Sequence, residues 1–364
     1  MPKQPQPKPG ITAISPYVGG KSKADGVARV IKLSSNENPW GPSPKAVAVY
    51  QAEATHLHRY PDGGHAALRA AIGEVHGLEA SQLICGAGSD ELIGMLVHGY
   101  AGAGDEVLYS AHGFLMYRIY TQANGATPVT APEKNLTADM DALLTAVTPR
   151  TKIVFLANPN NPTGTLIPFS EIRRFRAALP EEIILGLDAA YAEYLTAEDG
   201  YEDGISLVRA GTNTVVFHTL SKIYGLPALR LGWAYGPAAI IDIMNRVRSP
   251  FNVNAPALAA GVAAIHDQAY VADMRAKNTL ERSRVSQAIA AMGYTVVPSH
   301  ANFLLVNFGT QAAAVNTHLA AHGLIVRDVT GYGLPEYLRI SIGTTEENTL
   351  LLAALDTFHK ANAA

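Results

Sequence analysis

The sequence has little that would point to disulfides, membranes or nucleic acids. A single cysteine, Cys85, excludes an internal disulfide. The longest apolar run, 255–265, is alanine-rich and too short to cross a membrane. The 28 basic and 31 acidic residues give a net charge of -3, without the positive excess of a nucleic-acid-binding protein. The N-terminal MPKQPQPKPG also lacks the apolar core of a signal peptide. We therefore expect a cytoplasmic protein with no membrane and no nucleic-acid partner.

The chain is long enough for two domains and a large core. It has 364 residues, of which 48% are apolar and 16% charged, a composition typical of globular proteins. The proline-rich start predicts an extended N-terminal arm over 1–35. A large domain is expected over 36–255, and a smaller C-terminal α/β domain over 256–364, where the pattern of strands and helices changes.

Strands and helices alternate through the large domain. Apolar runs predict strands at 83–85, 106–109, 127–130, 152–156, 183–187 and 215–217. Helical patterns lie at 45–55, 66–75, 91–100, 114–123 and 170–178, with Ser43 as the cap and Pro44 at the first helical position of the earliest one. This alternation predicts an α/β fold with a mostly parallel sheet flanked by helices. In the small domain we expect one long helical region over 255–292, strands at 294–297, 303–306 and 338–342, and helices at 311–322 and 346–360.

One lysine stands in a distinctive setting, VVFHTLSKIYGLPALRLGWAY. Lys222 follows a buried strand, and its amine would be desolvated there, which lowers its pKa and favours a nucleophile. Thr219, Ser221 and Arg230 add donors that suit a phosphate. Lysine and phosphate donors together indicate pyridoxal 5'-phosphate (PLP). Taken alone, the same window also fits a surface lysine in a turn.

Two more strand ends carry polar side chains. Asp188 follows the apolar run IILGL, and a carboxylate there needs a cationic partner, such as a protonated pyridine nitrogen. Tyr191 and Asn161, the latter in NPNNPTG, could reach a phenolic oxygen of the same ligand. Asp188 alone also fits a helix cap, and the asparagine cluster also fits an ordinary loop.

Three further segments are less specific. GAGSDEL presents the amides of Gly88, Ser89 and Asp90 at a helix start, a ready anion site. Phe114 or Tyr117 could stack on a flat cofactor or belong to the core. Arg339 and Arg327, flanked by apolar residues, predict pairing with a carboxylate or phosphate, or a structural salt bridge.

The order of these motifs resembles the fold-type I PLP-dependent aminotransferases, and within them the histidinol-phosphate aminotransferase branch. The matching segments are SSNENPWGPSP, HRYPDGG, CGAGSDEL, HGFLMYR, NPNNPTG, LDAAYAEY, TLSKIYGLPALRLGW and LRISIGT, which span nearly the whole chain. The resemblance implies transamination between histidinol phosphate and 2-oxoglutarate (or glutamate) in L-histidine biosynthesis, by a homodimer with PLP and without a metal.

The resemblance also implies a role for each matching residue. Lys222 would carry the cofactor, Asp188 pair its ring nitrogen, Asn161 and Tyr191 hold its phenolic oxygen, and Phe114 stack on its ring. The phosphate contacts would come from Gly88, Ser89, Asp90, Thr219, Ser221 and Arg230, with Tyr60 of one subunit reaching the cofactor of the other. The substrate contacts would come from Arg339, Arg327, Tyr17 and Asn38.

Two departures from the family pattern leave questions open. SAHGF stands where many relatives have a Pro-Thr pair, which leaves the role of His112 open, and PYVGGKS only partly matches the segment around Tyr17. Alternatives within the fold are an aromatic or broad-range aminotransferase and a PLP-dependent phosphothreonine decarboxylase. A non-catalytic regulator would need a DNA-binding extension, which the sequence lacks.

Overall fold

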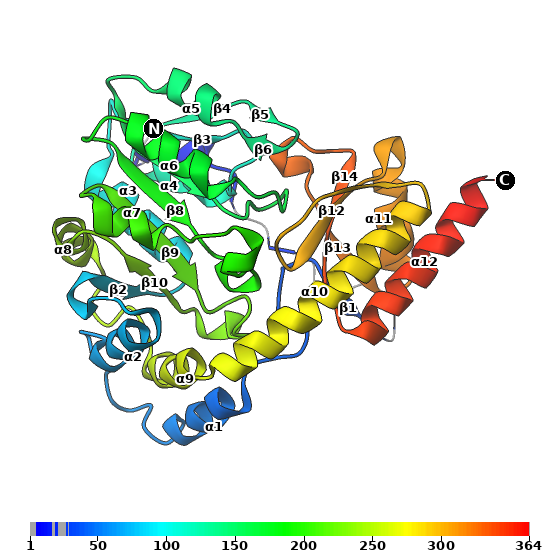
Figure 1. Ribbon diagram of the computed structural model, residues 1–364, viewed down its shortest axis with the longest axis horizontal. Coiled ribbons are helices and arrows are strands. Elements are labelled where there is room, and N and C mark those ends of the chain that lie inside the picture. The colour runs from blue at the N-terminus through cyan, green and yellow to red at the C-terminus, as the bar shows by residue number, and fades with distance from the viewer. Residues whose placement is uncertain (1–4, 17–18, 21–26, 28, 364) are drawn as a thin grey trace.

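The computed structural model describes residues 5–16, 19–20, 27 and 29–363, and two β-sheets organise it (Figure 1). The larger sheet has seven strands in the order β2 (Leu83–Gly86), β10 (Gly232–Tyr235), β9 (Thr214–Thr219), β8 (Ile184–Asp188), β7 (Thr151–Ala157), β3 (Glu106–Ser110) and β4 (Thr127–Ala131). All neighbours in it are parallel except β10, which runs antiparallel to β2 and β9. The expected mostly parallel sheet is confirmed.

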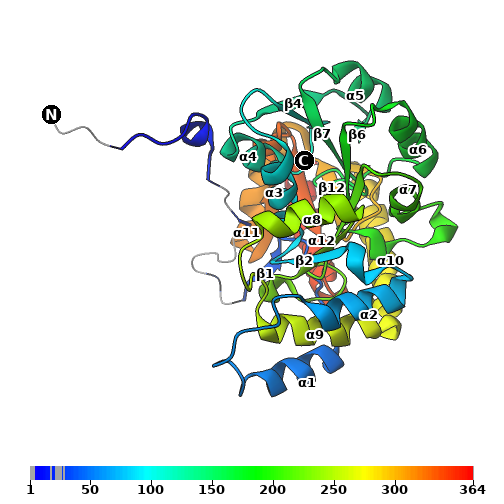
Figure 2. The ribbon, with the colours of Figure 1, turned by 90° about the vertical axis from the view of Figure 1, so that its left-hand side faces the viewer.

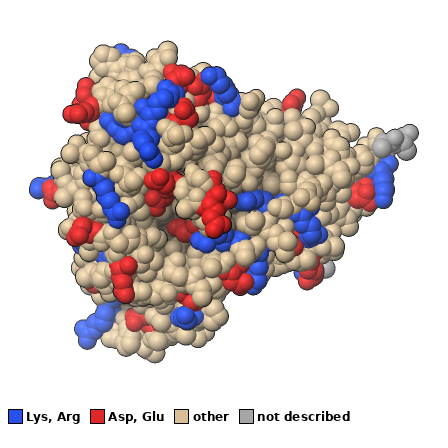
Figure 3. Space-filling model, viewed as in Figure 1, with Lys and Arg blue, Asp and Glu red and all other residues tan. Residues whose placement is uncertain are grey.

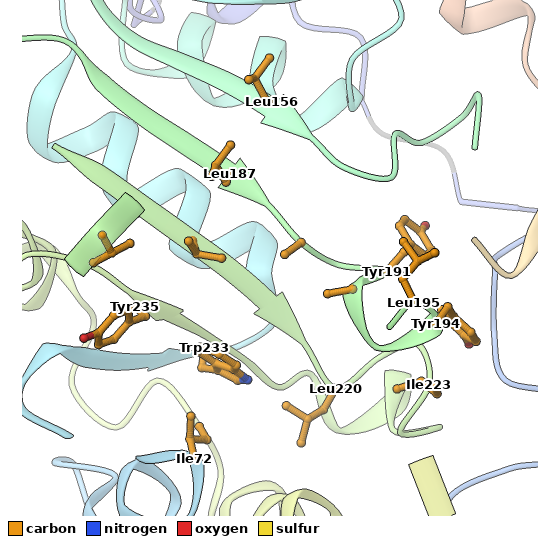
Figure 4. Packing of buried hydrophobic residues seen from close by; sticks show 14 of the residues in the cluster. Ile72, Leu156, Leu187, Tyr191, Tyr194, Leu195, Leu220, Ile223, Trp233 and Tyr235 are labelled. Carbon is orange, nitrogen blue, oxygen red and sulfur yellow. The ribbon is translucent and has the colours of Figure 1, made fainter. Parts of the chain in front are cut away.

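Both faces of this sheet are buried, which explains why its strands read as apolar runs. In β9, Val215 and Phe217 pack on one face and Val216 on the other. The first face is covered by α3 (Ser89–Tyr100), α4 (Leu115–Ala123) and α8 (Ala238–Val247). The second face is covered by α2 (Ala66–His76), α5 (Met140–Ala146), α6 (Phe169–Ala178), α7 (Ile205–Ala210) and α9 (Ala255–His266). Figure 4 shows Leu187, Trp233 and Ile72 in the hydrophobic cluster on this second face.

The smaller sheet has five strands, and helices cover one of its faces. Its order is β1 (Ile31–Leu33), β13 (Leu324–Asp328), β14 (Tyr337–Ser341), β12 (Phe303–Asn307) and β11 (Thr295–Val297). Its apolar core packs against α10 (Gln268–Ala291), α11 (Ala312–Ala321) and α12 (Thr345–Ala363). In β14, Leu338 and Ile340 point into this core, so alternation places Arg339 on the opposite face.

The remaining elements lie at the edges. The helix α1 (Pro44–Glu53) packs on α9, and β5 (Glu133–Lys134) pairs with β6 (Thr137–Ala138). A short 3-10 turn at Ile11–Ala13 lies beside α4, and residues 5–10 before it point away from the body (Figure 2). On the face in Figure 3, acidic and basic side chains are interspersed. Within the described ranges, no helix has the length and apolar character needed to cross a membrane.

The sequence-based element boundaries hold to within one or two residues in most places. Ser43 caps α1 with Pro44 at its first position, as expected. The long helical region 255–292, however, is two helices that meet at Asp267. The carboxylate of Asp267 binds the Ser43 hydroxyl (2.5 Å) and the Lys45 amine (2.8 Å), so a contact with a distant segment fixes the break. Strands β10 and β13 were not expected as separate elements.

Candidate active site

A cavity of about 490 Å³ lies at the carboxyl end of the parallel strands. The last residues of β7, β8 and β9 (Ala157, Asp188 and Thr219) all line it. Arg339 of the smaller sheet and the segment that follows β1 complete its wall. Ligands of open α/β sheets bind at this edge, so the cavity is the candidate active site.

Lys222 lies in the turn directly after β9 and lines the cavity. Its neighbours Leu220 and Ile223 are fully buried in the hydrophobic cluster drawn in Figure 4, so they anchor the turn. The lysine amine donates to the Ser35 carbonyl (3.3 Å) and lies 5.7 Å from the centre of the Tyr191 ring. Burial, and then the positive charge of Arg339, lower the pKa of Lys222 to about 8. This is a partly neutral amine facing a cavity and not a surface lysine.

Asp188 is a buried carboxylate with two hydrogen bonds. Its Oδ2 accepts from the Tyr117 hydroxyl (2.9 Å), and its Oδ1 accepts from the Ala190 amide (3.1 Å). Burial raises the pKa of Asp188, and these two bonds act in the opposite direction. The helix-cap alternative fails because only a short 3-10 turn, η3 (Ala192–Tyr194), follows. The carboxylate therefore offers its charge to the cavity that it lines.

The start of α3 forms an anion cradle. Gly88 precedes the helix with φ 95°, and a Cβ there would lie 2.3 Å from Nη2 of Arg230. Gly232 in β10 allows the same close approach, since a Cβ there would lie 2.5 Å from the Ser89 amide nitrogen. Arg230 donates to the Ser221 hydroxyl (3.3 Å) and to Asp90 (2.8 Å). Helix amides, hydroxyls and a guanidinium thus converge here, a donor set that suits a phosphate.

The two aromatic candidates have different places. Phe114 lines the cavity and meets Tyr117 edge-on, with ring centres 5.9 Å apart. Tyr117 is 1% exposed and stacks on Phe155 at 4.6 Å. Phe114 is therefore the ring available for stacking on a ligand, whereas Tyr117 belongs to the core and supports Asp188.

The opposite wall carries Arg339, Asn161 and Tyr191. Arg339 is 6% exposed and donates to the Ser34 carbonyl (2.9 Å) and to Oδ1 of Asn161. The Tyr191 hydroxyl accepts from the Asn36 side chain (2.9 Å). Burial raises the pKa of Tyr191, so its hydroxyl stays protonated and can donate to a ligand oxygen.

Three of the expected site residues, Tyr60, Asn38 and Arg327, do not line this cavity. Tyr60 is 83% exposed and stacks on Phe251 (4.6 Å), at a separate surface pocket. Asn38 is buried, and its side chain binds the Ile223 carbonyl (2.7 Å) and the Trp40 amide (3.0 Å). Asn38 therefore stabilises the turn that contains Lys222 and does not line the cavity.

Arg327 lines a neighbouring cavity of about 300 Å³ together with Arg118 of α4. Tyr17 lies outside the described residues. The substrate roles of Arg327 and Tyr17 stay predictions.

Several residues at the site were missed from the sequence. Ser35, Asn36 and Glu37 line the cavity although their segment reads only as a turn. Asn36 has φ 55° and is held by Ser341 of β14 and by Asn302, the residue before β12. No local sequence pattern predicts these contacts, because their partners lie hundreds of residues away in the sequence.

The open question of His112 has a structural answer. Its ring binds Glu133 (2.8 Å), and its backbone carbonyl accepts a hydrogen bond from the Asn160 side chain (3.1 Å). His112 therefore supports the NPNNPTG loop that contains Asn161. Within the part of the chain that the structure describes, no group of three or more His, Cys, Asp or Glu side chains could hold a metal ion.

The chain is similar to known aminotransferases. Residues 28–355 match the family model "Aminotransferase class I and II". A histidinol-phosphate aminotransferase of Paramagnetospirillum magneticum is 57% identical over 97% of this chain and 98% of its own. One from Rhodopseudomonas palustris is 52% identical over 98% of each. The crystal structure of histidinol-phosphate aminotransferase from Sinorhizobium meliloti in complex with pyridoxal-5'-phosphate superposes with a TM-score of 0.86, at 29% identity over 92% of each chain.

Proposed function

This chain belongs to the class I and II aminotransferases, and we propose that it transfers the amino group of histidinol phosphate to 2-oxoglutarate in L-histidine biosynthesis, with PLP as its cofactor. The observation that carries the proposal is one cavity that combines the amine of Lys222, whose pKa is about 8, with a buried carboxylate and an anion cradle. High identity to relatives of this name over nearly the full chain favours it over an aromatic or broad-range aminotransferase.

The residues fit the cofactor on their own chemistry. A side chain at Gly88 would displace the Arg230 guanidinium and the Asp90 carboxylate, so glycine there keeps the phosphate donors in place. Asp188, at the cavity wall, is a carboxylate that would gain a cationic partner from a protonated ring nitrogen. When bound, PLP supplies a reactive aldehyde carbon and an electron-withdrawing ring. Lys222, with its lowered pKa, offers a neutral amine as the nucleophile for that carbon.

The chain's own groups then divide the work. With the cofactor bound, the Lys222 amine would hold and move the proton at the substrate carbon. Asp188 would face the ring nitrogen with its negative charge. Asn161 and Tyr191, which line the cavity, would hold the phenolic oxygen, and Phe114 would pack on the ring.

Arg339 is the proposed contact for both substrates. A guanidinium can donate two parallel hydrogen bonds to a carboxylate or to a phosphate. One arginine can therefore bind glutamate and histidinol phosphate in alternate half-reactions. Arg327 is the proposed second phosphate donor. It lies directly opposite Arg339 in the antiparallel pair of β13 and β14, so the two side chains share a face of the sheet.

A homodimer is part of the proposal. Tyr60, Leu57 and Phe251 expose large apolar side chains around one surface pocket. Tyr60 is exposed and does not line the cavity of its own subunit, and in the proposed dimer it would reach the phosphate of the partner's cofactor. The proposed division into arm, large domain and small domain keeps the ranges 1–35, 36–255 and 256–364, with β1 joining the C-terminal strands.

The proposed compartment is the cytoplasm, which a free, buried Cys85 suits.

Initial rates test this function. Histidinol phosphate, phenylalanine and tyrosine are each supplied with 2-oxoglutarate, and glutamate formation is followed. We expect the highest kcat/KM with histidinol phosphate, since only that donor brings a phosphate for the arginines. A higher kcat/KM with either aromatic amino acid would favour the alternative function.

A further inference from the structure

A second polar cluster lies behind the strand that leads to Lys222. His218 is the residue before Thr219 in β9, and alternation turns its ring to the face away from the cavity. The ring is 2% exposed and stacks flat on Trp233, with centres 4.1 Å apart at an angle of 4°. Glu193 lies 3.0 Å from its Nδ1, and Asp203 lies 3.5 Å from its Nε2.

Two carboxylates around one imidazole decide its charge. A neutral histidine has one N–H donor and one acceptor nitrogen, so it can satisfy only one carboxylate, whereas the imidazolium can donate to both. Burial alone would lower the pKa of His218, but the contacts with Asp203 and Glu193 raise it to about 9. The positive charge therefore persists at neutral pH.

The other charged and titratable groups around the ring do not compete for this role. His76 of α2 lies 6.3 Å away between ring centres, and burial lowers its pKa, so it is neutral. Arg275 of α10 donates to the Glu193 backbone carbonyl and not to a carboxylate. His218 is thus the cation that the side chains of Glu193 and Asp203 contact directly.

The cluster joins the two segments that carry the candidate catalytic groups. Glu193 belongs to η3, the turn that follows Asp188 and Tyr191. His218 belongs to β9, which continues into Thr219, Ser221 and Lys222, and the residue before it, Phe217, is the register partner of Asp188. A contact between Glu193 and His218 therefore fixes the position of one segment against the other.

His218 also acts on Asp188 through charge. Burial raises the pKa of Asp188, and the positive charge of His218 is among the influences that lower it, after the hydrogen bonds from Tyr117 and Ala190. Loss of the imidazolium would make the ionised form of Asp188 less favourable.

We propose that His218 is a positioning residue: as an imidazolium held between Glu193 and Asp203, it fixes the turn of Asp188 and Tyr191 against the strand of Lys222. This inference rests on the proposed function, because it concerns how these residues meet the cofactor. A purely structural ion pair would stabilise the fold and leave the electrostatics of the site unchanged.

Three variants separate these roles. His218→Gln removes the charge but keeps an amide donor, and His218→Arg keeps a planar cation with donors on several sides. His76→Gln is the matched control, because it removes a buried neutral imidazole from the same cluster. Each protein is loaded with PLP, and the absorbance of the bound cofactor is titrated with pH alongside kcat and KM.

For His218→Gln we expect the midpoint of the absorbance titration to rise by about one pH unit, because a nearby positive charge is lost. We also expect kcat to fall about tenfold with KM changed far less, since the loss acts on the reacting groups and not on substrate binding. His218→Arg should restore the wild-type midpoint, and His76→Gln should keep it. A wild-type midpoint and kcat in His218→Gln would overturn the proposal.

Direct observation covers the case in which His218→Gln does not fold. Nitrogen-15 NMR of the wild-type protein at pH 7 should show one buried imidazole with both nitrogens protonated, and a neutral ring would overturn the proposal. The absorbance titration needs bound PLP but no particular amino donor. If histidinol phosphate is not a substrate, the proposed function fails while this test of His218 stands.

Discussion

The pKa of Lys222 leads to the most quantitative prediction. Burial and the charge of Arg339 lower it from 10.5 to about 8. At pH 7 about a tenth of the amine is then neutral, against roughly 0.03% for an ordinary lysine, a gain of about 300-fold in nucleophile. The rate at which the cofactor-free protein captures PLP should therefore rise with pH to a midpoint near 8.

Substitution of Arg339 tests the cause. Arg339→Gln removes the positive charge but leaves the burial, so the midpoint should move up by about one pH unit. Arg339→Lys is the control, because it retains the charge and should keep the midpoint near 8. Stopped-flow absorbance between pH 6 and 11 measures all three proteins. A wild-type midpoint near 10.5, or equal midpoints in the Gln and Lys variants, would refute the reasoning.

Four further predictions concern the rest of the site. Asp188→Asn should fold normally but lose about 1.5–3 kcal/mol of interaction with the ring nitrogen, seen as a kcat at least about tenfold lower; near-normal turnover would count against the pairing. Gly88→Ala should displace Arg230 and weaken PLP binding about tenfold in a fluorescence titration, and unchanged affinity would remove the cradle. Arg327→Lys should reduce kcat/KM about tenfold for histidinol phosphate and less for phenylalanine; equal losses would make Arg327 structural. Mixing Tyr60→Phe with Lys222→Ala protein should restore activity, because each heterodimer then holds one intact site; no recovery after subunit exchange would argue against a shared site.

The strand-end residues could be predicted from the sequence because their signal is local. Asp188 and Lys222 follow apolar runs, and parallel strands bring such ends to one edge of a sheet. The alternative interpretations of Asp188 and of the aromatic pair could not be resolved from the sequence. Tyr117 contacts Asp188 across 71 residues, and only the fold shows that this ring is committed to the core.

The other wall of the cavity was beyond the sequence for a different reason. Ser35, Asn36 and Glu37 follow a three-residue strand that pairs with β13, nearly 300 residues later. The substrate role expected for Asn38 also depended on the fold, because its side-chain amide donates to the Ile223 carbonyl in the turn of Lys222. The break between α9 and α10 at Asp267 likewise depends on contacts with Ser43 and Lys45. Helical periodicity alone therefore predicts one continuous helix there.

The central claim is that PLP is held by Lys222 in this cavity, and peptide mapping tests it most directly. Borohydride reduction of the PLP-loaded protein fixes the cofactor to its lysine, and digestion followed by mass spectrometry locates it. We expect the pyridoxyl group on Lys222 in the peptide that contains Ser221. A pyridoxyl group on any other lysine, with Lys222 unmodified, would contradict the account.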